Sequence, residues 1–102
     1  MERRAATMRG GWVYILASRR NGTIYTGMTA NLAARIWQHK NRPKGFAGKY
    51  GAGMLVHVEE YPTIQEAIAR EKAVKKWLRR WKLALIEKDN PEWEDLYERI
   101  LG

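Results

Sequence analysis

The chain contains no cysteine, and this absence removes several kinds of chemistry at once. Disulfide bridges, zinc sites built on thiolates and thiol nucleophiles are all excluded. Histidine is scarce as well, because only His39 and His57 are present, so a histidine-rich zinc site is not expected. Any metal site in this protein must therefore use oxygen or imidazole ligands.

Long apolar runs are also missing. The run Trp12 to Ala17 is short, whereas a helix needs about 20 apolar residues to cross a bilayer. It is also too short for a typical signal-peptide core, so we expect a cytoplasmic protein with no membrane association. The length of 102 residues favours one compact domain. We expect it at residues 11–102, behind a flexible basic arm at residues 1–10.

Acidic residues are few relative to basic ones. Lysine and arginine total 19 against 11 aspartate and glutamate residues, which gives a net charge of +8. Such an excess on a small domain favours a polyanionic partner. Between Lys75 and Lys82 the cations alternate with Trp77 and Trp81, a pattern in which rings stack on bases while charges meet phosphates. Alternatively, the two tryptophans share the buried face of a helix, since they are four residues apart.

Periodicity and turn signals predict the order of the elements. Strands are expected at residues 12–17, 23–27 and 54–61, and helices at residues 31–40, 63–77, 80–88 and 92–101. Thr29 is the expected N-cap of the first helix, and Thr63 with Glu66 forms a capping box for the second. The order β-β-α-β-α-α predicts an α+β fold, a small three-stranded antiparallel sheet flanked by helices.

The dipeptide Asn21-Gly22 is a strong hairpin signal between the first two strands. A two-residue turn there places Ser18 opposite Tyr25. Because strand side chains alternate between faces, Tyr14 then lies on the same face of the sheet as Tyr25. Two tyrosines on one face are commonly only packing, so this pair alone does not define a site.

Glu71 interrupts an apolar stripe at helical spacing. The stripe is formed by Ile64, Ala67, Ile68, Val74 and Leu78. An unpaired charge facing a core is costly. One explanation is a structural pair with an arginine or lysine, although such pairs contribute little stability. The other is a metal ion, because Mg²⁺ often needs only one or two protein carboxylates.

Arg35 and His39 share one face of the first helix, beside the apolar line of Leu32 and Ile36. Both side chains are therefore expected at a cleft on the edge of the core. Taken singly, Arg35 is as well explained as a solvated surface cation. His39 alone is as well explained as a structural hydrogen-bonding residue.

Taken together and in order, these residues resemble the GIY-YIG nuclease superfamily. The two half-motifs read Val13-Tyr14-Ile15 and Tyr25-Thr26-Gly27, Arg35-x-x-x-His39 looks like the family's helix motif, and residues 66–71 look like its metal-site helix. The chain is similar to small stand-alone members that are related to the N-terminal domain of the UvrC endonuclease. The resemblance covers residues 11 to 98.

The resemblance implies a metal-dependent endonuclease that hydrolyses DNA phosphodiester bonds, selects DNA structures and works in repair or recombination. It implies Mg²⁺ or Mn²⁺ anchored by Glu71, with Arg35 holding the scissile phosphate. Tyr14 or Tyr25 would orient or deprotonate the attacking water. His39 would relay a proton or hold a tyrosine hydroxyl in place.

Six further residues are expected to contact DNA. They are Lys49 and Tyr50 in the glycine-rich segment, and Lys75, Lys76, Arg79 and Arg80 beside the tryptophans. Two other functions stay open: a non-catalytic nucleic-acid-binding module, and an accessory protein that docks on a repair factor through Trp93 and Tyr97. The carboxylate of Glu71 in an apolar stripe argues against a pure binding module.

Overall fold

The computed structural model describes residues 10–41, 48–49 and 51–101. Its strands are β1 (Gly11–Ala17), β2 (Ile24–Thr29) and β3 (Met54–Tyr61), and its helices are α2 (Leu32–Asn41), α4 (Ile64–Lys75), α5 (Arg79–Asp89) and α6 (Tyr97–Leu101). The expected order of strands and helices is confirmed. The expected basic arm lies outside the described residues, apart from Gly10.

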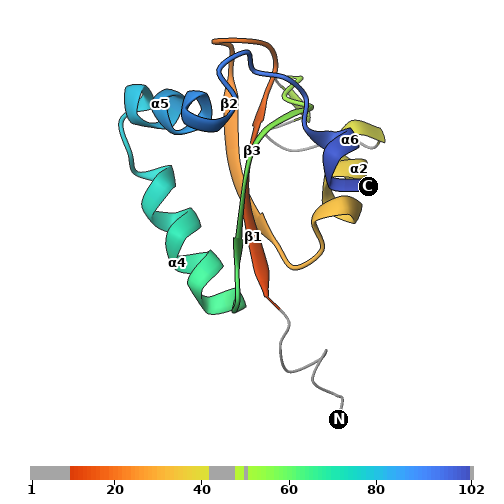
Figure 1. Ribbon diagram of the computed structural model, residues 1–102, viewed down its shortest axis with the longest axis vertical. Helices are drawn as coiled ribbons and strands as arrows, with labels where there is room; N and C mark the ends of the chain where they lie inside the picture. The colour runs from red at the N-terminus through yellow and green to blue at the C-terminus, as the bar shows by residue number, and fades with distance from the viewer. Residues whose placement is uncertain (1–9, 42–47, 50, 102) are drawn as a thin grey trace.

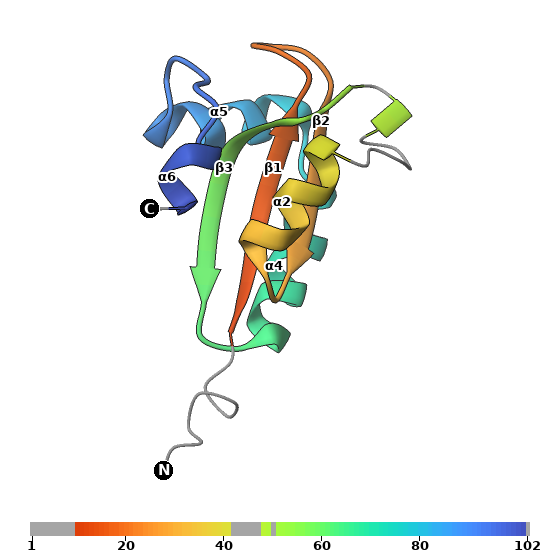
Figure 2. The same ribbon diagram turned by 90° about the vertical axis from the view of Figure 1, so that its right-hand side faces the viewer.

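The three strands form one antiparallel sheet in the order β2-β1-β3. Helices α4 and α5 cover one face of the sheet, and α2 and α6 lie against the other (Figures 1 and 2). The expected α+β architecture is therefore confirmed. In the part of the chain that is described, no helix has the length and apolar character needed to cross a bilayer.

The central strand β1 is buried on both faces because helices cover both sides of it. Tyr14 and Leu16 pack with Leu32 and Ile36 of α2. Side chains of the alternate positions, Ile15 and Ala17, point the other way and pack with Val56, Ile86 and Trp93. Tyr14 projects from the face that α2 covers, whereas Glu71 belongs to α4, which covers the other face (Figure 1).

The hairpin turn is longer than its Asn-Gly signal indicates. Leu16, not Ser18, lies opposite Tyr25, so the expected two-residue turn is wrong. Ser18 instead closes a loop, because its Oγ accepts the backbone N–H of Thr23 at 3.0 Å, and Asn21 adopts a positive φ of 60° inside that loop. The register differs from the expected one by two residues, so Tyr14 and Tyr25 still share a face.

The N-cap of the first helix lies two residues after the predicted one. Thr29 is the last residue of β2, and its Oγ1 accepts the backbone N–H of Asn31 at 3.0 Å. Asn31 is the cap, since its Oδ1 accepts the N–H of Ala34 at 3.2 Å. At α4 the predicted cap is confirmed, with Thr63 Oγ1 accepting the N–H of Glu66 at 3.1 Å.

The predicted last helix is wrong over its first half. Residues 92–96 are not helical, and Trp93 has a left-handed φ of 57°. The Asn90 side chain holds this loop by donating to the carbonyls of Val56 and Glu94. Trp93 is 2% exposed and belongs to the core, so it is not available to dock a partner.

Candidate active site

The hairpin supplies the centre of the site by placing Tyr14 directly opposite Gly27. A Cβ added to Gly27 would lie 2.5 Å from both Cζ and Oη of Tyr14. The phenol ring therefore leans from the central strand across the backbone of β2. Because β2 is an outer strand of the sheet, the hydroxyl is carried toward an open edge.

Helix α2 brings His39 onto this hydroxyl. Leu32 and Ile36 are buried and fix the helix on the sheet, and His39 lies one turn further along the same side. The Tyr14 hydroxyl is 3.0 Å from His39 Nε2. The Tyr25 ring completes the cluster, with its centroid 6.4 Å from that of Tyr14 and 5.7 Å from that of His39.

Arg35 acts on the same pair from one turn earlier in α2. Burial raises the pKa of Tyr14, and a hydrogen bond from the Arg35 guanidinium opposes that rise. Burial, followed by the positive charge of Arg35, lowers the pKa of His39. Near neutral pH the imidazole is therefore uncharged, and with its proton on Nδ1 its Nε2 accepts a hydrogen bond from the Tyr14 hydroxyl.

Helix α4 brings a carboxylate to the same edge. The side chain of Glu71 is 16% exposed and lies 2.8 Å from Lys75 Nζ, and the Lys75 side chain is 49% exposed. Lys75 Nζ also lies 6.0 Å from the ring centroid of Tyr25. The Glu71 charge contributes to the raised pKa of Tyr14, so the two groups are within electrostatic reach.

The apolar stripe that singled out Glu71 is shorter than predicted. Ala67 and Val74 are fully buried, but α4 ends at Lys75. Leu78 lies beyond it as the N-cap of α5 and is 48% exposed, so its predicted place in the stripe is wrong. A structural pair with an arginine or lysine was one of the two explanations for Glu71, and Lys75 is that partner; glutamate followed four residues later by lysine is a recognised helix pair.

The residues expected to contact DNA fall into two groups, one in the segment before β3 and one where α4 ends and α5 begins. Lys49, Lys76 and Arg80 are exposed, and Tyr50 lies outside the described residues. Arg79 ties α5 to the hairpin loop, because its Nη2 donates to the carbonyl of Gly22 at 2.6 Å and to that of Asn21 at 3.1 Å. Trp77 and Trp81 form an edge-to-face pair, and Trp81 is 50% exposed.

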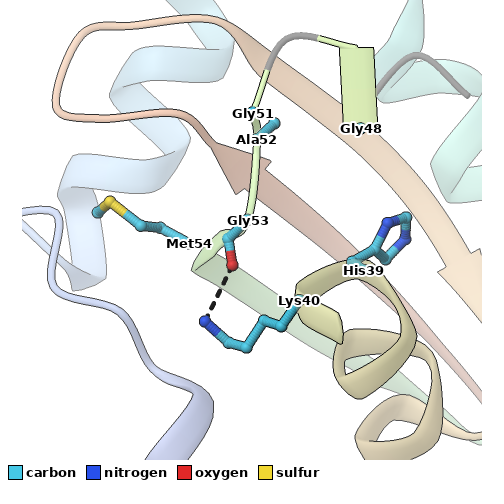
Figure 3. Close-up of a pocket in the computed structure, with 7 residues that line it drawn as sticks. All are labelled: His39, Lys40, Gly48, Gly51, Ala52, Gly53 and Met54. Carbon is cyan, nitrogen blue, oxygen red and sulfur yellow. Dashed lines mark hydrogen bonds between the residues drawn. The ribbon is translucent and has the colours of Figure 1, made fainter. Parts of the chain in front are cut away.

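An open hollow of about 340 Å³ adjoins the imidazole of His39 (Figure 3). Its remaining lining comes from Lys40, Gly48 and residues 51–54. Figure 3 shows the side chains of His39 and Lys40 diverging, with Lys40 Nζ donating to the carbonyl of Gly53 at 3.0 Å. The volume of the hollow is within the range of about 300–1,000 Å³ that is usual for small-ligand sites.

The donor set at this edge suits only some metals. The described residues contain no group of three or more acidic or imidazole side chains arranged to hold an ion. Glu71 therefore supplies one carboxylate without a surrounding cage of ligands. One carboxylate fits a hard cation such as Mg²⁺, which keeps several waters and binds substrate phosphates, and does not fit an all-protein zinc or calcium site.

Most of the chain matches a known protein family. The GIY-YIG catalytic domain model matches residues 10–84. A UPF0213 protein of Syntrophus aciditrophicus is 38% identical over 93 residues, covering 83% of this chain and 98% of the relative. A UPF0213 protein of Clostridium perfringens is 38% identical over 95 residues, covering 89% of this chain and 97% of the relative.

A solved structure is similar as well. The solution NMR structure of a UPF0213 protein from Bacillus halodurans superposes with a TM-score of 0.54 at 30% sequence identity. The match covers 84% of this chain and 92% of that one. Sequence and structure thus agree, and the chain belongs to the GIY-YIG catalytic domain family.

Proposed function

We propose that this protein is a metal-dependent endonuclease that hydrolyses DNA phosphodiester bonds. One observation carries the proposal. At a single edge of the sheet, the Tyr14 hydroxyl lies beside His39 and Arg35 and within electrostatic reach of Glu71. An acceptor for a proton, a cation for a phosphate and a carboxylate for a metal are the groups that phosphodiester hydrolysis needs. Membership of the GIY-YIG family supports the same reaction class.

Glu71 is the residue that would hold the metal, which we propose to be Mg²⁺ or Mn²⁺. When bound, the cation supplies positive charge that stabilises the negative charge developing on the phosphate and the leaving oxygen. Glu71 must first release Lys75, whose side chain is 49% exposed. The two residues are four apart on one helix, and helix pairs of this spacing contribute only about 0.3–0.5 kcal/mol, so this exchange costs little.

Arg35 binds the scissile phosphate in this proposal. It is an exposed residue beside the Tyr14 hydroxyl, so a phosphate oxygen can reach its guanidinium from solvent. The planar guanidinium presents two parallel N–H donors to two oxygens, which fixes the orientation of the phosphate as well as binding it.

In this proposal Tyr14 handles the attacking water, since its hydroxyl lies 3.0 Å from His39 Nε2. Its raised pKa keeps the proton on the phenol near neutral pH. The phenol oxygen accepts a hydrogen bond from the water while its proton is donated to His39 Nε2. As the water attacks phosphorus and the bond from phosphorus to the leaving oxygen breaks, the proton of the water passes to Tyr14 and the phenol proton passes to His39, while the leaving oxygen takes a proton from solvent.

Exposed basic residues are proposed to bind the DNA backbone. Lys49, Lys76 and Arg80 are exposed and suit contacts to the phosphates on either side of the cut. Such contacts recognise the shape and charge of DNA rather than its base sequence, which favours selection of a DNA structure. DNA repair or recombination in the cytoplasm is the setting we propose for that activity.

Cleavage of defined DNA structures tests the proposal. Purified protein is incubated with branched, nicked, single-stranded and intact duplex DNA, each with Mg²⁺, with Mn²⁺ and with excess EDTA. We expect cleavage of at least one structure with metal and none with EDTA. Binding without cleavage under every condition would overturn the proposal and favour a non-catalytic nucleic-acid-binding module or an accessory protein.

A further inference from the structure

A second polar cluster lies between β3 and α4, and the reaction proposed above does not use it. Glu59 of β3 is its centre and accepts four hydrogen bonds. His57 Nε2 lies 2.8 Å from Oε2 and the Tyr61 hydroxyl donates to Oε1 at 2.7 Å. Arg70 of α4 donates to both oxygens, through Nε at 2.9 Å and Nη2 at 3.0 Å.

The cluster is largely shielded from water. The side chains of His57, Glu59 and Arg70 are 4%, 14% and 29% exposed. Burial tends to raise the pKa of Glu59, but hydrogen bonds from His57, Arg70 and Tyr61 hold it well below its usual range. The ring of Trp77 also lies against the guanidinium of Arg70, with Arg70 Cζ 4.9 Å from the ring centroid. Arg70 is therefore held in one orientation.

Arg70 and Glu71 are consecutive residues on opposite sides of the line by which α4 packs on the sheet. That line is formed by Ala67 and Val74, which are fully buried. At about 100° per residue, Arg70 lies about 50° to one side of the line and Glu71 about 50° to the other. Arg70 reaches the outer strand β3, whereas Glu71 and Lys75 lie toward the outer strand β2, where Lys75 approaches Tyr25.

We propose that the Glu59–Arg70 pair is a positioning device that sets the rotation of α4 about its axis and thereby aims Glu71 at Tyr14. Ala67 brings α4 close to Gly11 of β1, but its side chain is a single methyl group that does not fix the rotation of the helix by itself. A two-pronged pair anchored on β3 resists rotation well, because both oxygens of Glu59 are engaged. The assignment of Glu71 as metal anchor rests on the proposed function, whereas the control of helix rotation does not.

Two variants loosen the pair without emptying the space. Arg70→Lys keeps the charge and removes the fork, and Glu59→Gln keeps the shape and removes the charge. Amide residual dipolar couplings of α4, measured against those of the sheet in metal-free protein, report the rotation of the helix. We expect a shift in the phase of these couplings in both variants. If Arg70→Lys fails to fold, Glu59→Gln carries the test.

Metal binding gives a second measurement that needs no cleavage. In a calorimetric titration with Mn²⁺ alone, both variants are expected to bind about 10–100-fold more weakly, as when residues that orient a metal ligand are changed. The double variant should be no weaker than the worse single one, because the two changes break the same pair. Ile86→Val is the matched control, since Ile86 is a core residue of α5 packed away from this pair.

The outcomes separate this inference from the proposed function. Unchanged helix rotation in both variants would overturn the inference, whatever the activity. Ile86→Val gives a second way to overturn it. If that variant loses as much melting temperature and as much Mn²⁺ affinity as the two pair variants, the effect is general destabilisation. A third outcome is a wild-type protein that binds Mn²⁺ but cuts no DNA, together with a rotated α4 in both variants. That result would support the inference and contradict the proposed nuclease activity.

Discussion

The Tyr14 ring occupies the space above Gly27 that any other residue would fill with its Cβ. Gly27 is thus required by contact rather than by backbone conformation, since the described positive-φ positions are Asn21, Gly51 and Trp93. The absence of a side chain lets the phenol lean over β2 and meet the groups on α2 and α4. The half-motifs of the hairpin therefore work as one unit, a ring and the glycine beneath it.

Gly27→Ala should destabilise the fold and displace the Tyr14 hydroxyl. Overpacking of this kind costs about 1–3 kcal/mol, and a domain of this size loses roughly 4–8 °C of melting temperature per kcal/mol. Gly53→Ala is the matched control, because a Cβ at Gly53 meets nothing within 4 Å. Thermal denaturation of both variants checks the prediction, and equal melting temperatures would show that the ring has room to move.

The pH dependence of cleavage should follow His39. Its pKa is lowered from 6.5 by burial and by Arg35, so the imidazole is neutral through the neutral range. Cleavage should be level there and fall on the acid side with a midpoint below 6.5, as protonation removes the acceptor for the Tyr14 proton. His39→Gln can still accept a hydrogen bond but does not titrate, so it should be slower and lack this acid limb.

The same group links stability to pH. The unfolded chain binds a proton at His39 near 6.5, and the folded chain only at lower pH. Its contribution to stability is therefore present above 6.5 and is lost as pH falls through the folded pKa.

The cleavage profile of His39→Gln can also contradict this assignment. If the rate of cleavage by that variant falls on the acid side as it does in the wild type, the acid limb belongs to another group.

Arg35→Lys should separate catalysis from binding. It keeps the positive charge but loses the two parallel donors, so cleavage should fall about 100-fold or more while DNA affinity changes little. Single-turnover cleavage and fluorescence anisotropy on one substrate provide the two numbers. Parallel losses in both would make Arg35 an ordinary binding residue, and near wild-type cleavage would remove it from the site.

DNA binding should be largely electrostatic, given the net charge of +8. The logarithm of affinity should fall linearly with the logarithm of salt concentration, by about 0.9 for each duplex phosphate neutralised. The double variant Lys76→Gln/Arg80→Gln should reduce that slope by about 2 and weaken all sequences alike. Anisotropy titrations between low and physiological salt give the slope, and a flat response would contradict the expectation.

Local signals predicted much of this fold. Alternation and capping predicted all three strands and most of the helices, because those elements depend on neighbouring residues. The tail was mispredicted since Trp93 and Asn90 are held by residues of β3 and α5, which helical periodicity does not contain. The hairpin register failed for a related reason: Ser18 closes the loop on Thr23 through its side-chain Oγ as well as its backbone N–H, and the turn signal contains no such side-chain bond.

The candidate site was predicted as a set of residues but not as a geometry. Tyr14, Tyr25 and His39 were expected to be neighbours, and their rings do meet. Nothing in the spacing indicates that Tyr14 rather than Tyr25 bonds His39, because that depends on how α2 lies across the hairpin. The Glu59–Arg70 pair was missed for the same reason, since its two residues belong to different elements and are 11 positions apart in sequence.

We propose that Glu71 is present for metal chemistry. Replacing it with glutamine keeps the shape and removes the charge. The pair with Lys75 is partly exposed, and pairs of that kind contribute about 0.2–1 kcal/mol, so the melting temperature should change by only a few degrees. Glu66→Gln makes the same change at an exposed position of the same helix and serves as the control.

Cleavage by the two variants, measured side by side with Mn²⁺ on the DNA structure that the wild type cuts best, is the most direct test. We predict that Glu71→Gln stays folded, loses Mn²⁺ binding and cuts about 100-fold more slowly or worse, because the charge stabilisation that a metal supplies is worth several kcal/mol. Glu66→Gln should cut at the wild-type rate. Metal-dependent cleavage by Glu71→Gln at the rate of Glu66→Gln would contradict the account.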